Sequence, residues 1–151
     1  MKFETIVAYP DAKLPERATK YAAGYDFYIA AETVCPPGEI TLIPTGVKCE
    51  LDKNCWLQLA VRSSTPKKKH LMLANGIGII DADYYNNPDN EGHIMFQVYN
   101  FGKEPVTLEK NDRIGQGVIC RYEVTDDDMA KGLREGGFGS TDAASILSKL
   151  F

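Results

Sequence analysis

A single segment of the chain, Asn75 to Tyr84, gathers the side chains best suited to chemistry. Within it, the apolar pair Ile79-Ile80 leads directly into Asp81, and Tyr84 follows three positions later. A buried strand that ends in a carboxylate and an aromatic ring would hold both groups rigidly, because the scaffold fixes the backbone that carries them. The amide of Asn75 can donate and accept hydrogen bonds, which suits the edge of a base or another planar polar ligand.

Two basic segments carry side chains that could bind a ligand, and the first has the composition of a phosphate-binding turn. Arg62-Ser63-Ser64 follows an expected strand and combines a guanidinium with two hydroxyls and the amides of a turn. Arg113-Ile114-Gly115-Gln116 stands at an expected junction of turn and strand, where Gln116 could face a ligand and Arg113 could pair within the protein. Neither segment is specific by itself, because similar sequences also occur in ordinary surface turns.

Two further segments join glycine to functional side chains. Ala23-Gly24-Tyr25-Asp26-Phe27 puts Asp26 at the start of a strand, where a structural ion pair and a ligand contact are both open. Gly136-Gly137-Phe138-Gly139-Ser140-Thr141 favours neither strand nor helix, since three glycines leave its backbone free. Its ring could stack on a planar ligand while its amides and hydroxyls wrap phosphate oxygens, and a disordered tail is the alternative.

The elements that must position these residues are predicted to be strands. In Cys55–Val61 and His93–Asn100, apolar side chains recur at every second position. Further strands are expected at Thr41–Pro44, Val47–Leu51, Val106–Leu108 and Gly117–Tyr122, with turns at Pro36-Pro37-Gly38 and Pro44-Thr45-Gly46 among others. Regular turns and alternation of period two are typical of an all-β sandwich or barrel. Helical signal is limited to Leu14–Ala23 and Asp126–Lys131, each long enough for a turn or two.

Bulk composition limits the possible functions. A length of 151 residues fits one domain, and a formal net charge of −4 argues against direct nucleic acid binding, for which basic side chains supply most of the affinity. The four cysteines have no CxxC spacing and lie far from both histidines, so no zinc site is expected. Free thiols, with no signal-peptide pattern and no membrane-spanning apolar run, predict a cytoplasmic protein without membrane contact.

Taken in chain order, the five segments resemble the five motifs of the trimeric dUTP pyrophosphatases, or dUTPases. The resemblance runs from about Gly24 to Thr141, nearly the whole domain. It implies an all-β, jelly-roll-like β-sandwich over residues 1–133 and a flexible glycine-rich C-terminal arm over 134–151 that closes the active site. It also implies a homotrimer whose active sites are shared between subunits. Beyond the arm's motif, residues 142–151 have the spacing of a short amphipathic helix.

The resemblance also implies roles for individual residues. Asp81 activates the attacking water and holds the deoxyribose 3′-OH, and Tyr84 lies under the sugar and excludes a ribose 2′-OH. Asn75 and nearby backbone read uracil, and Phe138 stacks on it. The full set of implied substrate-binding residues is Arg62, Ser63, Ser64, Asn75, Ile79, Ile80, Tyr84, Met95, Gln116, Arg134, Phe138, Gly139, Ser140 and Thr141. Asp26 is expected near the waters of a Mg²⁺ ion that the triphosphate itself mainly chelates.

The implied activity is hydrolysis of dUTP to dUMP and pyrophosphate by in-line attack of water on the α-phosphorus, which limits uracil in DNA and supplies dUMP. One alternative is a dCTP deaminase of the same fold. That chemistry needs a glutamate on the strand after the aspartate motif, and Gln97 stands there with an amide that cannot shuttle a proton. Another is a regulatory binding protein on the same scaffold, which contacts a protein partner through the C-terminal tail or through the Tyr85–Gly92 loop, which is longer than the usual hairpin.

Overall fold

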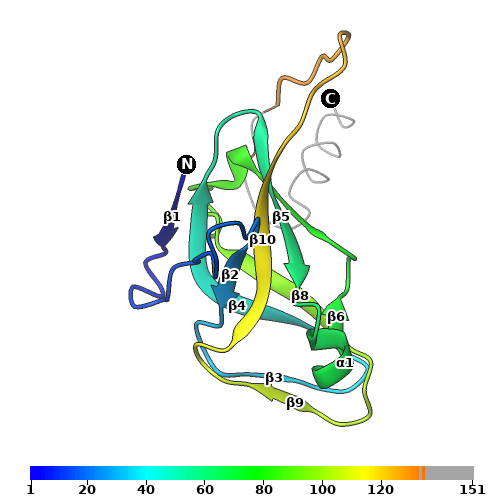
Figure 1. Cartoon of the computed structure of the whole chain (residues 1–151). Helices are drawn as coiled ribbons and strands as arrows, with labels where there is room; N and C mark the ends of the chain where they lie inside the picture. Colours follow the sequence, from blue (N-terminus) through cyan, green and yellow to red (C-terminus); the bar gives the residue numbers. More distant parts are fainter. Residues whose placement is uncertain (133, 135–151) are drawn as a thin grey trace, which may run out of the picture.

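Antiparallel strands make up almost all of the regular secondary structure in the computed structural model, which describes residues 1–132 and 134 (Figure 1). One sheet has the strand order β1-β4-β8-β6 and the other has the order β2-β10-β5-β7, while β3 and β9 form a two-stranded ribbon. The strands are β1 (Lys2–Thr5), β2 (Tyr25–Tyr28), β3 (Thr33–Cys35), β4 (Ile40–Glu50), β5 (Cys55–Val61), β6 (Leu71–Leu73), β7 (Gly78–Asp81), β8 (Ile94–Asn100), β9 (Val106–Leu108) and β10 (Arg113–Arg121). The predicted all-β sandwich is therefore confirmed.

Alternating apolar side chains fill the space between the two sheets. On β8, Ile94, Phe96 and Val98 are fully buried, whereas the residues between them are half-buried. The ring of Phe96 meets that of Phe27 from β2 at a centroid distance of 5.7 Å, so this aromatic pair joins one sheet to the other. A Cβ at Gly115 on β10 would collide with the Phe96 ring, and glycine there lets the sheets approach closely.

Strand β4 differs from its prediction. Its sequence reads as two strands separated by a Pro44-Thr45-Gly46 turn, but β4 runs continuously from Ile40 to Glu50. Its pairing with β8 shifts register between Pro44 and Val47, and Gly46 has φ +70°. The turn residues therefore form a bulge that bends the strand without reversing it.

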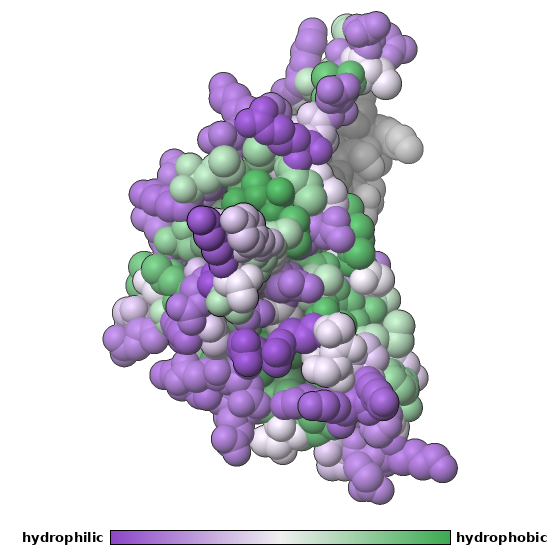
Figure 2. All heavy atoms as spheres, viewed as in Figure 1, coloured by the Kyte–Doolittle hydropathy of each residue, from purple (hydrophilic) through white to green (hydrophobic). Residues whose placement is uncertain are grey.

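Helices are few and do not lie where the sequence suggests. Neither Leu14–Ala23 nor Asp126–Lys131 contains a helix, so both expectations are wrong. The helices found are α1 (Thr65–Lys69), which has a proline in its first turn, and the 3₁₀ turn η1 (Ala82–Tyr84). No helix among the described residues is long and apolar enough to cross a membrane. Figure 2 shows a face on which hydrophobic patches are broken up by hydrophilic side chains.

Register fixes where the two groups of candidate residues lie. Strand β7 pairs with β5 so that Asp81 stands opposite Trp56, near the start of β5. Arg62 follows the last residue of β5, at its other end. Asp81 and the segment Arg62-Ser63-Ser64 therefore belong to opposite ends of the same strand. At about 3.3 Å per residue, the six positions between Trp56 and Arg62 span roughly 20 Å.

Candidate active site

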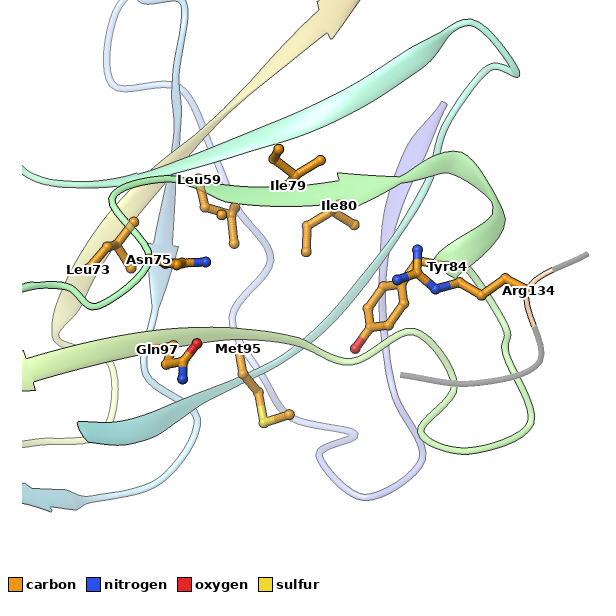
Figure 3. A pocket seen from close by; sticks show the side chains of 10 residues that line it. Leu59, Leu73, Asn75, Ile79, Ile80, Tyr84, Met95, Gln97 and Arg134 are labelled. Atoms are coloured by element: carbon orange, nitrogen blue, oxygen red, sulfur yellow. The ribbon is translucent and has the colours of Figure 1, made fainter. Parts of the chain in front are cut away.

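A pocket opens between β7 and β8, and most of its walls are apolar (Figure 3). Asn75 and Gln97 place their amides at one end, and Tyr84 and Arg134 stand at the other. The complete lining is Leu59, Leu73, Asn75, Gly78, Ile79, Ile80, Tyr84, Met95, Gln97 and Arg134. Apolar walls with a few polar groups at fixed places are typical of a site for a planar ligand.

Glycine at position 78 makes part of this pocket possible. A Cβ on Gly78 would lie 2.9 Å from the Leu59 Cβ, so any larger residue would push β7 away from β5. With glycine there, β7 stays paired to β5 through Asp81. The β-branched pair Ile79-Ile80 then carries the chain to the carboxylate at the strand end, as the sequence predicts. The expected burial of this strand is wrong, because β7 lies at the edge of its sheet and Ile79 is exposed.

The carboxylate of Asp81 follows the pocket-lining Ile80 and is half exposed. Its Oδ2 atom lies 2.7 Å from Nη1 of Arg134, which also lies 3.6 Å from Oδ1 of Asp83. The Arg134 guanidinium sits over the Tyr84 ring at 5.2 Å from its centroid. Arg134 therefore connects the carboxylates to the aromatic ring, and these residues form one cluster.

Tyr84 is fixed in the pocket by burial and by two hydrogen bonds of its hydroxyl. Its side chain is buried, its hydroxyl donates to the carbonyl of His93 at 2.9 Å, and that hydroxyl accepts from Nδ2 of Asn90 at 2.8 Å. Burial raises the pKa of the phenol above its ordinary value, so the hydroxyl stays protonated. The ring is thus fixed as a wall of the pocket.

His93 lies behind Tyr84 and helps to fix it. Its Nε2 atom accepts a hydrogen bond from the backbone N–H of Gly46 at 2.9 Å, and its ring packs against Tyr9 at a centroid distance of 5.6 Å. Burial lowers the pKa of the imidazole to about 4, and the nearby charge of Glu91 opposes this shift. The neutral imidazole therefore carries its proton on Nδ1.

The remaining candidate residues lie away from the pocket, around β10 and the end of β5. Gln116 on β10 stands opposite Ala60 of β5 and Asp26 of β2. A Cβ at Gly24 would collide with the Gln116 side chain, which explains why the segment before β2 carries glycine. Oδ2 of Asp26 lies 3.1 Å from Nη1 of Arg113. The predicted internal pairing of Arg113 and the ion-pair reading of Asp26 are both confirmed.

The structure thus divides the predicted site residues into two groups. Around the pocket it gathers Asn75, Ile79, Ile80, Asp81, Tyr84, Met95 and Arg134. Apart from these lie Asp26, Arg62, Ser63, Ser64 and Gln116. Sequence reasoning missed the contributions of Leu59, Leu73, Gly78 and Asn90. The predictions for Phe138, Gly139, Ser140 and Thr141 fall outside the described residues.

Comparison with known proteins decides the family. The family model described as dUTPase matches residues 10–142, most of the chain. The chain belongs to the dUTPase family. The chain is 50% identical over 146 residues to a deoxyuridine 5′-triphosphate nucleotidohydrolase of Lactococcus lactis, a match that covers 93% of this chain and 97% of the relative. The chain is accordingly a dUTP diphosphatase, which hydrolyses dUTP to dUMP and pyrophosphate.

Solved structures agree with this assignment. The chain is similar to the crystal structure of dUTPase from Streptococcus mutans. The TM-score is 0.82 and the identity 46%, and the match covers 83% of this chain and 99% of that one. It also shares its fold with a dUTPase of phage phi11 of S. aureus, described as coordinating a structural Mg(II) ion, at a TM-score of 0.70, 21% identity, and coverage of 87% and 98%. The jelly-roll-like fold predicted from the motifs is confirmed.

Proposed function

We propose that the pocket binds the deoxyuridine part of dUTP and that Asp81 activates the attacking water. The juxtaposition of Asn75, Tyr84 and Asp81 around one apolar cavity carries this proposal. An amide at the far end suits the polar edge of uracil, and a buried ring beside the carboxylate suits the sugar. Gln97 also lines the base end, so its amide is a second group available to uracil.

The chemistry requires a base near the α-phosphorus and cations near the leaving pyrophosphate. Asp81 is half exposed, which leaves its carboxylate accessible to water. As a general base it would remove a proton from water during in-line attack. Arg134, now paired with Asp81, would turn to the phosphates when substrate arrives, because triphosphate oxygens compete with the carboxylate for the guanidinium.

The active sites of a homotrimer would be shared between subunits. Asp81 and Arg62 lie at opposite ends of β5, roughly 20 Å apart. Within one subunit, the two side chains would therefore not reach the same α-phosphate. Exposed apolar side chains on the sheets also favour burial by other subunits. These are Ile40, Leu42, Met72 and Ile79. The phosphate turn of one subunit would then complete the pocket of another.

Mg²⁺ would be held mainly by the triphosphate. Among the described residues there is no group of three or more His, Cys, Asp or Glu side chains that could hold a metal ion. The carboxylate of Asp26 already has Arg113 as a partner, so it suits a water-mediated contact better than direct chelation. Mg²⁺ bound in this way neutralises charge that develops on the phosphate oxygens.

Pyrophosphate release from dUTP, measured beside dCTP, dTTP and UTP with and without Mg²⁺, tests the substrate assignment. We expect release from dUTP alone among the four, and release that depends on Mg²⁺. Ammonia release from dCTP would instead support a deaminase. A regulatory partner at the Tyr85–Gly92 loop stays a prediction.

Subunit mixing tests the sharing of sites. A chain with Asp81→Asn and a chain with Arg62→Ala, each nearly inactive alone, would regain up to about a quarter of the parental activity after co-refolding, because mixed trimers contain intact sites. The control mixture pairs Asp81→Asn with Tyr84→Ala. It should recover nothing, since both residues belong to the same end of one chain. No recovery in the first mixture would show that each site lies within one subunit.

A further inference from the structure

The Tyr85–Gly92 loop is built around the pocket tyrosine. Asn87 is buried at 5% exposure, although it lies in a surface loop, and it makes four hydrogen bonds. Its Nδ2 atom donates to the carbonyl of Tyr84 and to Oδ1 of Asn90, both at 2.8 Å. Its Oδ1 atom accepts from the backbone N–H groups of Asp89 and Asn90 at 3.1 Å. A buried polar side chain with all these partners fixes the loop backbone.

Asn90 connects the ordered loop to the Tyr84 side chain. Its Oδ1 atom accepts from Asn87 Nδ2 and from the backbone N–H of Gly92. Because these two donors hold the Oδ1 side of the amide, its Nδ2 atom points to the Tyr84 hydroxyl and donates to it at 2.8 Å. The hydroxyl in turn donates to the His93 carbonyl. The two asparagines therefore hold Tyr84 at its backbone and at its hydroxyl.

The loop is also fastened to the body of the protein. Nζ of Lys48, on β4, lies 3.5 Å from Oε2 of Glu91, and the backbone N–H of Val7 donates to Glu91 Oε1 at 3.2 Å. The hydroxyl of Tyr85 donates to Glu4 on β1. These contacts lie on either side of the asparagine pair, so the pair holds Tyr84 against a fixed frame.

We propose that Asn87 and Asn90 are positioning residues that set the selectivity of this enzyme for deoxyribose over ribose. The inference rests on the proposed function of Tyr84 as the wall beneath the sugar. A wall excludes an extra hydroxyl only if it cannot retreat, and the Tyr84 hydroxyl lies on the side of the pocket toward β8, where the loop holds it (Figure 3). Loss of the Asn90 contact would let the ring yield to a 2′-OH.

Steady-state hydrolysis of dUTP and UTP by Asn90→Ala tests the proposal. We expect the ratio of kcat/KM for UTP to that for dUTP to rise about tenfold, because a hydrogen bond that fixes the ring is lost. Asn90→Asp is the isosteric variant that removes only the donor: the single proton of the Tyr84 hydroxyl already goes to the His93 carbonyl, so a carboxylate cannot replace the lost hydrogen bond and the ratio should rise as in Asn90→Ala. Pro88→Ala, in the same loop but exposed, is the matched control and should leave the ratio unchanged.

A double-mutant cycle separates this role from general loosening of the fold. Tyr84→Phe removes the hydroxyl that Asn90 contacts, so adding Asn90→Ala to it should change the ratio no further. An unchanged ratio in folded Asn90→Ala would overturn the proposal, and so would additive effects in the cycle. If Asn90→Ala does not fold, Tyr84→Phe alone decides, because an unchanged ratio there would also overturn it. A parental enzyme that hydrolyses UTP as well as dUTP would instead refute the proposed role of Tyr84.

Discussion

The two ends of strand β5 are prepared for substrate in different ways. At the end near Trp56, Tyr84 and Asn87 are buried, Asn90 is half-buried, and all three are hydrogen-bonded within one chain. At the other end, the side chains of Arg62, Ser63 and Ser64 have no hydrogen bond or ion pair to any described residue. The proposed sugar end is therefore preorganised, whereas the proposed phosphate end would gain its contacts from substrate or from another subunit.

Replacing the carboxylate at the preorganised end should have the largest effect. Asp81→Asn is expected to lower kcat about 10³-fold, because an amide cannot take a proton from water. Binding of dUTP, measured by calorimetry, should largely survive. The matched control is Asp83→Asn, which removes a carboxylate from the same cluster. Turnover of Asp81→Asn at the parental rate would show that another residue is the base.

Acid should weaken the preorganised end through His93. The pKa of this imidazole is about 4 in the folded protein, below its ordinary value of 6.5, so the unfolded chain binds more protons between these pH values. Stability from this group is complete above pH 6.5 and falls as the pH drops toward 4, by about 3 kcal/mol in total. Urea titrations across this range measure the loss. His93→Gln should flatten it, whereas His70→Gln, at an exposed histidine, should not.

The phosphate end should respond in activity and not in stability. Arg62→Ala is expected to lower kcat/KM for dUTP about 10²-fold, because a cation facing the phosphates is lost. Its melting temperature should stay at the parental value, since the side chain has no described partner within the chain. Lys68→Ala, at an exposed lysine on the adjacent α1, serves as control for charge alone. A fall in melting temperature with Arg62→Ala would contradict the contrast between the two ends.

The smallest expected effect is on the free energy of unfolding when one polar side chain at each end of β5 is replaced by alanine. Asn87→Ala should lower the free energy of unfolding by about 2 kcal/mol, because it leaves buried partners without hydrogen bonds. Ser63→Ala should change it by less than about 0.5 kcal/mol, since the hydroxyl is exposed. Urea denaturation measures both. Equal losses would mean that the two ends are equally ordered.

Sequence predicted the local features of this fold better than its long-range pairing. The bounds of β5 and β9 match their predictions because alternation of period two is a local signal. Strand β4 was split at Pro44-Thr45-Gly46, since a bulge and a turn use the same residues. Helix α1 was missed because five residues give too little periodicity, although Ser64-Thr65-Pro66 is typical of a helix start.

The candidate site shows the same limit. The motifs identify Asp81, Tyr84 and Arg62 as candidate site residues. They do not predict that Asp81 pairs with Trp56, the register that places Asp81 and Arg62 at opposite ends of β5. The hydrogen bond from Asn90 to the Tyr84 hydroxyl could not be predicted either, because an Asn-rich segment is typical of a surface turn. Side-chain networks depend on the backbone course of a loop, and spacing alone does not fix that course.

The contacts of Glu91 and Tyr85 connect the N-terminal segment to the loop that holds Tyr84. Glu4 on β1 accepts a hydrogen bond from Tyr85, and the Val7 N–H donates to Glu91, so the loop that holds Tyr84 is hydrogen-bonded to the N-terminal segment. An affinity tag fused at this end, or a shortened start, would act on the nucleotide preference of the enzyme as well as on its purification. Assays of ribose rejection are therefore best made without a tag at this end.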